Sequence, residues 1–135
     1  MPESTKVVDS WAMVAWIQNE PAAPAFRSFL EEAYSGNITL LMSWLNVAET
    51  FYTLAKRNSP EVAEAFLIRL PSLPIRIMLP DEDGIMMAAR IKARHPVAFG
   101  DSFAIALAEV EQASIITGDN EIRQCAVVPV DWIGS

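Results

Sequence analysis

Residues 100–119, GDSFAIALAEVEQASIITGD, contain the clearest structural pattern in the chain. A nearly all-apolar helix is expected to follow Asp101, and a short β-branched run then leads to Gly118 and Asp119. An apolar helix followed by an apolar strand is typical of a parallel sheet that is covered by helices. The stretch therefore predicts an α/β fold, with one acidic side chain at the start of the helix and another just after the strand.

The same alternation of strand and helix extends along the whole chain. Five short, mostly apolar runs have strand length and show no alternation, as expected for strands covered on both faces: 6–9, 39–42, 75–79, 114–117 and 127–130. Pro129 lacks an N–H donor, so the last run is expected at an edge of the sheet. We expect one domain, residues 1–135, with a mainly parallel sheet and right-handed crossovers.

Helical segments separate these runs, and several carry recognisable start signals. The expected helices are 10–19, 25–34, 44–57, 60–70, 81–95, 100–112 and a short one after Gly118. Ser59 followed by Pro60 is the favoured pair at a helix start. The acidic run that begins at Asp81 suits a helix N-terminus, and Pro96 ends that helix.

Composition limits the class of protein. Hydrophobic residues make up 52% of the 135 residues, which excludes a disordered chain. The single cysteine, Cys125, cannot form an internal disulfide and is expected to pack as a small apolar side chain. Residues 1–6 lack the order of a signal peptide, and no apolar run reaches about 18 residues. We expect a soluble cytoplasmic protein with no membrane segment.

The chain is acidic, with 17 Asp and Glu residues, 10 Lys and Arg residues and a net charge of −7. This balance argues against nucleic-acid binding that depends only on basic side chains at phosphates. A cluster of carboxylates that holds a divalent metal ion would account for part of the excess charge.

Four acidic residues fall where a parallel α/β sheet binds its ligands, outside the carboxyl ends of the strands. Asp9 ends the first strand run, Asp119 follows the fourth, and Asp101 begins the apolar helix. Glu49 lies in a helix turn with few polar neighbours and shares a face with Asn46. Taken singly, Asp9 and Asp101 also suit helix caps, and Asp119 also suits a turn.

Together the four carboxylates predict a hard-oxygen site for Mg²⁺ or Mn²⁺. The chain has one His, His95, and one Cys, so a His-rich zinc site, a Ser-His-Asp triad and a Cys-His pair are excluded. A receiver-type signalling domain fits poorly, because no acid doublet follows the first strand and no lysine follows the last. A phosphatase with an Asp-x-Asp nucleophile is excluded because Ser10 and Trp11 follow Asp9.

In these motifs the chain resembles the PIN-domain nucleases, and most closely the VapC-type toxins of toxin–antitoxin pairs. The matching stretches, in order, are VVDS at 7–10, EP at 20–21, NVAE at 46–49, GDSFA at 100–104, ITGD at 116–119 and VDWI at 130–133. The resemblance implies a three-layer α/β/α fold with a central parallel five-stranded sheet in the order 3-2-1-4-5. It also implies an RNA substrate and products with a 5′-phosphate and a 3′-hydroxyl.

The resemblance further suggests roles for particular residues. The four acids are expected to hold one or two Mg²⁺ or Mn²⁺ ions, and Glu49 or Asp101 is expected to orient or deprotonate the attacking water. The candidates for supporting the ligands or positioning the substrate are Thr117, Asn46 and Ser10. The basic run of Arg90, Lys92 and Arg94 is either a solvated helix end or a contact for the RNA backbone.

Partners are expected from the same resemblance. The large aromatic side chains of the early helices are expected to be mostly core, with some in an exposed patch: Trp11, Trp16, Phe26, Phe29, Trp44, Phe51 and Tyr52. In this family the early helices commonly receive a cognate antitoxin, and a homodimer is usual. The alternatives are a standalone PIN-domain nuclease that processes RNA and a non-catalytic PIN-like binding module.

Overall fold

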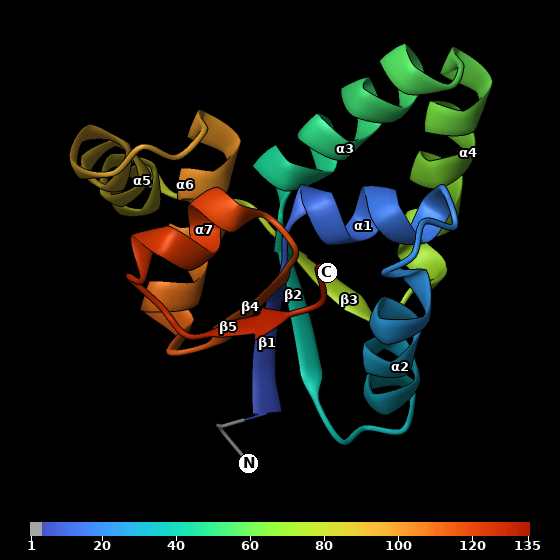
Figure 1. The fold of residues 1–135 in the computed structure, drawn as a ribbon, viewed down its shortest axis with the longest axis horizontal. Coiled ribbons are helices and arrows are strands. Elements are labelled where there is room, and N and C mark those ends of the chain that lie inside the picture. The colour runs from blue at the N-terminus through green and yellow to red at the C-terminus, as the bar shows by residue number, and fades with distance from the viewer. Residues whose placement is uncertain (1–3) are drawn as a thin grey trace.

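A computed structural model describes residues 4–135 and shows a sheet of five parallel strands in the order β3-β2-β1-β4-β5 (Figure 1). The expected fold class and strand order are therefore confirmed. The strands are β1 (Thr5–Val8), β2 (Thr39–Ser43), β3 (Ile75–Met78), β4 (Ser114–Thr117) and β5 (Val130–Trp132). Residues 1–3, which belong to the N-terminal stretch in which no signal-peptide order was found, lie outside the described residues.

Helices cover both faces of the sheet. Neighbouring strand residues point to opposite faces, and the apolar side chains on each face pack against helices. Val8 packs in one core cluster with the first four helices, whereas Val7 packs in a second cluster with the later helices. The first layer contains α1 (Ser10–Ile17), α2 (Ala23–Tyr34), α3 (Trp44–Arg57) and α4 (Pro60–Arg69), followed by a 3₁₀ turn, η2 (Leu70–Ser72). The second layer contains α5 (Glu82–Arg94), α6 (Phe99–Glu111) and α7 (Asn120–Cys125). This is the three-layer arrangement that the sequence predicts (Figure 1).

Two predicted helix starts are confirmed in atomic detail. The Ser59 hydroxyl caps α4 by accepting from the Val62 N–H, with Pro60 as the first helical residue. The Asp81 carboxylate caps α5 by accepting from the Gly84 N–H at 2.9 Å. These side chains satisfy backbone donors that have no partner within the helix.

The last strand lies further along the chain than the predicted run 127–130. β5 begins at Val130, after Ala126 in the left-handed backbone region (φ 57°). Val127 and Val128 still pack against the core, so their apolar character reflects burial in an irregular segment. Pro129 has no N–H to donate, but its carbonyl accepts from the Ile115 N–H at 3.0 Å. The predicted edge position is confirmed, since β5 pairs only with β4.

The aromatic side chains of the early helices are only partly in the core. Phe26 is fully buried, and Trp11, Trp16, Phe29 and Phe51 are half-buried. Trp44 and Tyr52 are 43% and 54% exposed. Among these aromatic residues, the expected exposed patch is therefore limited to two side chains of α3.

Within residues 4–135, every helix is too short or too polar to span a lipid bilayer.

A lysine crosses the sheet and connects three strands. The Lys6 ammonium, on β1, lies 2.8 Å from Asp131 Oδ2 on β5. Ser114 of β4 also donates to this carboxylate, so one acid is shared by both neighbours. The Lys6 side chain is 18% exposed and the Asp131 side chain 30% exposed. This contact holds the three-residue edge strand to the centre of the sheet.

We expect Asp131→Ala to destabilise the protein by about 1 kcal/mol, more than a typical exposed ion pair, because it leaves a partly buried ammonium unpaired. Thermal unfolding followed by circular dichroism measures the effect. Glu64→Ala, which removes the same charge from an exposed position of α4, is the matched control. An equal melting temperature for the two variants would contradict the role given to Asp131.

Candidate active site

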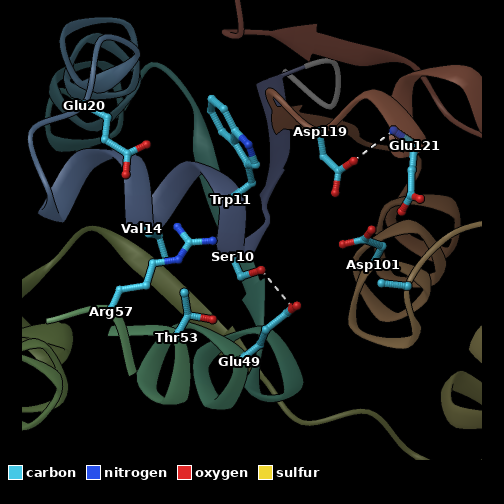
Figure 2. A pocket seen from close by; sticks show the side chains of 11 residues that line it. Ser10, Trp11, Val14, Glu20, Glu49, Thr53, Arg57, Asp101, Asp119 and Glu121 are labelled. Carbon is cyan, nitrogen blue, oxygen red and sulfur yellow. Dashed lines mark hydrogen bonds between the residues drawn. The ribbon is translucent and has the colours of Figure 1, made fainter. Parts of the chain in front are cut away.

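Four elements bring acidic side chains together at the carboxyl edge of the sheet. β1 and β4 are adjacent, with Val8 in register with Ile116, so Asp9 and Asp119 follow neighbouring strand ends. Asp101 enters from α6 and Glu49 from α3. A cavity of about 220 Å³ opens here (Figure 2); its lining residues are Ser10, Trp11, Val14, Glu20, Glu49, Thr53, Arg57, Ala98, Asp101, Asp119 and Glu121. Three of the four predicted acids line it, and the fourth, Asp9, is fully buried and is not part of the lining.

Asp9 is a structural cap as well as a candidate site residue. Its side chain is 0% exposed, and both of its oxygens accept hydrogen bonds. The Ala12 N–H donates to Oδ1 at 2.9 Å, which caps α1, and the Thr117 hydroxyl donates to Oδ2 at 2.5 Å. The cap interpretation of Asp9 is therefore confirmed, and Thr117 is the residue that joins β4 to this carboxylate.

Asp101 is not a cap. The residue at the N-cap position of α6 is Ala98, and Asp101 lies in the first turn with 5% exposure. Its Oδ2 is buried and has no hydrogen-bond partner within the described residues. A buried carboxylate oxygen without a donor is costly unless a cation or a proton accompanies it. This oxygen is the strongest local indication that the cluster can hold a cation.

Asp119 caps α7 and approaches a carboxylate that the sequence analysis did not include. The Glu121 N–H donates to Asp119 Oδ1 at 2.8 Å, and the Asp119 N–H donates to the Thr117 hydroxyl at 2.9 Å. One carboxylate oxygen from each of Asp101, Asp119 and Glu121 lies within 4.8 Å of the others. Glu121 had a signal in the sequence, because an acid in the first turn after Asp119 is directed by the same helix end (Figure 2).

Glu49 is half-buried and is held by neutral donors. The Ser10 hydroxyl donates to Glu49 Oε1 at 2.8 Å, and the Asn46 amide donates to the same oxygen at 3.4 Å. Of its apolar neighbours in the helix, Ala48 and Tyr52 are exposed. Asn46 and Ser10 therefore orient Glu49, and Figure 2 shows the bond from Ser10.

The backbone of α6 comes close to Glu49 because residue 100 has no side chain. The Asn46 amide donates to the Gly100 carbonyl at 2.9 Å, which joins α3 to the start of α6. A Cβ at Gly100 would lie 2.4 Å from Glu49 Oε1, well inside contact distance. Glycine at this position therefore lets the carboxylates of α3 and α6 share one cavity.

Burial and mutual repulsion raise the proton affinity of two carboxyl groups. Burial raises the pKa of Asp9 from 3.8 to about 7, although the hydrogen bonds from Thr117 and Ala12 lower it. Burial, followed by the negative charge of Asp119, raises the pKa of Asp101 to about 8. Both shifts show that the folded protein brings these negative charges together at a cost in free energy.

The predicted basic residues lie elsewhere. Arg90, Lys92 and Arg94 are exposed on α5, and none of them lines the cavity. The Lys92 ammonium donates to the Val97 carbonyl at 2.7 Å, which favours the interpretation of a helix-end contact for that residue. The cavity contains instead a cation that the sequence analysis did not single out, Arg57 of α3.

Comparisons with known proteins agree with this fold. No curated protein sequence gives a significant match to the chain. Among solved structures, VapBC2 from Rickettsia felis, bound to a promoter DNA fragment, matches with a TM-score of 0.75 and 16% identity, over 94% of this chain and 97% of that chain. VapC20 from Mycobacterium tuberculosis, a toxin that cleaves the sarcin-ricin loop, matches with a TM-score of 0.74 and 16% identity, over 90% of this chain and 95% of that chain.

A third structure, FitAcB from Neisseria gonorrhoeae, has a TM-score of 0.64 and 20% identity, over 93% of this chain and 95% of that chain. At these identities the likeness shows the fold. The family is shown by a sequence model, since the model of the PIN domain matches residues 6–128. That match includes all four acids and the strands and helices that carry them, and on it this chain belongs to the PIN domain family.

Proposed function

We propose that this protein is a ribonuclease that hydrolyses RNA phosphodiester bonds with the help of Mg²⁺ or Mn²⁺. The observation that carries the proposal is the buried, unpartnered Oδ2 of Asp101 beside Asp119. Family membership supports nuclease chemistry, and VapC20, with the same fold, is described as a toxin that cleaves the sarcin-ricin loop.

The donor set suits a hard divalent cation. Carboxylate oxygens are the ligands that Mg²⁺ and Mn²⁺ prefer, and Mg²⁺ also keeps several water molecules. Asp101 and Asp119 would hold the ion directly, with Glu121 beside them and Asp9 behind. The bound ion would lower the pKa of a water molecule and polarise the phosphate.

The chain's own residues would fix the geometry of the reaction. Thr117 holds Asp9 at the end of β1, so the carboxylates of β1 and β4 keep one orientation. Ser10 and Asn46 both donate to Glu49 Oε1. No hydrogen bond within residues 4–135 reaches Oε2, which leaves that oxygen free to accept a proton from the attacking water.

We further propose that the protein acts as the cytoplasmic toxin of a toxin–antitoxin pair, with a cognate antitoxin as partner and a homodimer as its assembly. The neighbours with the same fold support the pairing, because they include VapBC2 bound to a fragment of promoter DNA and a toxin–antitoxin complex from Klebsiella pneumoniae. Of the alternatives, a non-catalytic binding module is disfavoured because all four acids are present at the carboxyl edge of the sheet.

Cleavage of RNA tests the catalytic proposal directly. We expect purified protein, freed of any antitoxin, to cut RNA with Mg²⁺ or Mn²⁺, and EDTA to stop the reaction. Asp9→Asn and Asp101→Asn should each lower the rate at least about a hundredfold, because each weakens the carboxylate cluster. Gel analysis of labelled RNA measures the rate. Equal cleavage by wild type and both variants would refute the proposal.

Glu121→Gln distinguishes the ligand set. If Glu121 contacts the ion, this nearly isosteric change should weaken Mn²⁺ binding about tenfold in calorimetry. Glu64→Gln, on an exposed face of α4, should leave Mn²⁺ binding unchanged and serves as the control. Unchanged binding in Glu121→Gln would restrict the site to the four acids predicted from sequence.

Metal-free protein should become less stable as the pH rises. Asp9 and Asp101 bind protons more tightly in the folded state, so the free energy of unfolding falls as the pH rises above the ordinary value of 3.8, and the loss is complete above their raised pKa values. The shift of Asp9 alone, from 3.8 to about 7, corresponds to roughly 4 kcal/mol at most. We therefore expect a lower melting temperature at pH 8 than at pH 5, and an increase when Mn²⁺ is added at pH 8.

Asp9→Asn removes the titrating group and provides the control. The metal-free variant should melt above wild type at pH 8, and its melting temperature should change less between pH 5 and pH 8. Stability of the metal-free wild type that rises over this interval would contradict the pKa shifts given to the cluster.

Expression in bacteria tests the toxin proposal. We expect induction of the wild-type chain to arrest growth, because cleavage of cellular RNA blocks translation, and induction of Asp9→Asn at equal protein level to permit growth. Normal growth with active, soluble wild-type enzyme would contradict a toxin role and would favour a standalone RNA-processing nuclease.

A further inference from the structure

The cavity continues beyond the carboxylates, and its other side has a different character. Figure 2 shows Asp101, Asp119 and Glu121 on one side of Ser10, and Glu20 and Arg57 on the other. Arg57 is the only basic side chain among the residues that line the cavity in the described chain. The remaining charged residues of the lining are acids.

Arg57 has no partner inside the protein. Within residues 4–135 its guanidinium forms no salt bridge and donates no hydrogen bond, and the only ion pair there joins Lys6 to Asp131. Glu20 lines the same cavity without pairing with Arg57. Figure 2 shows the Arg57 side chain directed across the cavity toward α1, near Ser10 and Val14. The guanidinium is therefore available to an anion that enters the cavity.

We propose that Arg57 binds a phosphate of the RNA strand next to the phosphate that is cut. This inference rests on the proposed ribonuclease function. A guanidinium contacts a phosphate through two parallel hydrogen bonds, which fixes both position and orientation. A strand whose scissile phosphate lies at the carboxylates must continue along the cavity, where Arg57 is the one side chain that attracts its negative charge.

The ordinary explanation of Arg57 is a helix-end charge, and Lys56 separates the two explanations. Lys56 and Arg57 both lie in the last turn of α3, where a cation complements the helix dipole. Lys56 is exposed, as Arg57 is, but it does not line the cavity. Lys56→Ala and Arg57→Ala therefore remove the same charge from the same helix turn, and they differ in their position relative to the cavity.

The binding test uses the full chain in an Asp9→Asn background with Mg²⁺ present. Asp9 does not line the cavity, so this background keeps the surface that RNA contacts. A short fluorescent single-stranded RNA is titrated and followed by anisotropy at several salt concentrations. Arg57→Ala should weaken binding roughly tenfold, the loss of one charged hydrogen-bonded contact. It should also lower the slope of log affinity against log salt by about 0.7.

Lys56→Ala should leave both quantities near those of the background. Arg57→Lys should retain part of the affinity, because an ammonium keeps the charge but loses the paired hydrogen bonds. In otherwise wild-type enzyme, Arg57→Ala should raise KM more than it lowers kcat. Mn²⁺ affinity should not fall, since Arg57 is not a ligand.

Unchanged binding and salt slope in Arg57→Ala would overturn the inference, as would equal losses in Arg57→Ala and Lys56→Ala. Failure of the ribonuclease proposal looks different: the Asp9→Asn protein would cleave RNA as fast as wild type. The two proposals are therefore tested separately, because the comparison of Arg57 with Lys56 measures binding and does not require cleavage.

Discussion

Burial of neighbouring carboxyl groups at the carboxyl edge of the sheet is the constraint on which the rest of the structure depends. Asp9 is fully buried, which is the largest cause of its raised pKa, and the negative charges of Asp119 and Glu49 raise that pKa further. A sheet gathers such groups because parallel strands end at one edge, and it can hold them there only if its own packing is strong. Val7 and Val8 of β1 are completely buried in the two opposite core clusters, so the strand that carries Asp9 is anchored on both faces.

Local contacts give two of the carboxylates, Asp9 and Asp119, a structural task besides their proposed chemical one. Asp9 caps α1 and Asp119 caps α7, so both helices start where the strands before them end. Thr117 links the two by donating to Asp9 and accepting from the Asp119 backbone. Asp101 has no such task, because Ala98 occupies the N-cap position of its helix. A buried acid with no structural use is hard to explain by stability alone. Asp101 is therefore stronger evidence for a functional site than Asp9 and Asp119, which also cap helices.

The sequence predicted the fold and most of the site because both depend on local patterns. Apolar runs marked the strands, and acids just after β1 and β4 followed from strand ends. β5 was misplaced because an apolar segment can be buried without pairing, as at Val127. Glu121 and Arg57 were missed for another reason. The face of a helix that meets the cavity is set by tertiary packing, which one sequence does not display. For Glu121 there was still a local signal, its place in the first helical turn after Asp119; for Arg57 there was none.

The negative net charge of −7 is a property of the whole surface, whereas the proposed recognition of RNA takes place in one cavity. There the acids and Arg57 occupy different sides of Ser10, so the lining is not uniformly repulsive (Figure 2). A cation held by the acids would turn that side from repelling a phosphate to attracting it. Arg57 would then provide a second site that attracts a phosphate, and this site needs no bound cation. Two phosphate-binding sites along one cavity define the direction in which an RNA strand runs, whereas a single site does not. An acidic protein can therefore bind a polyanion with selective placement, and its overall charge disfavours attachment elsewhere on its surface.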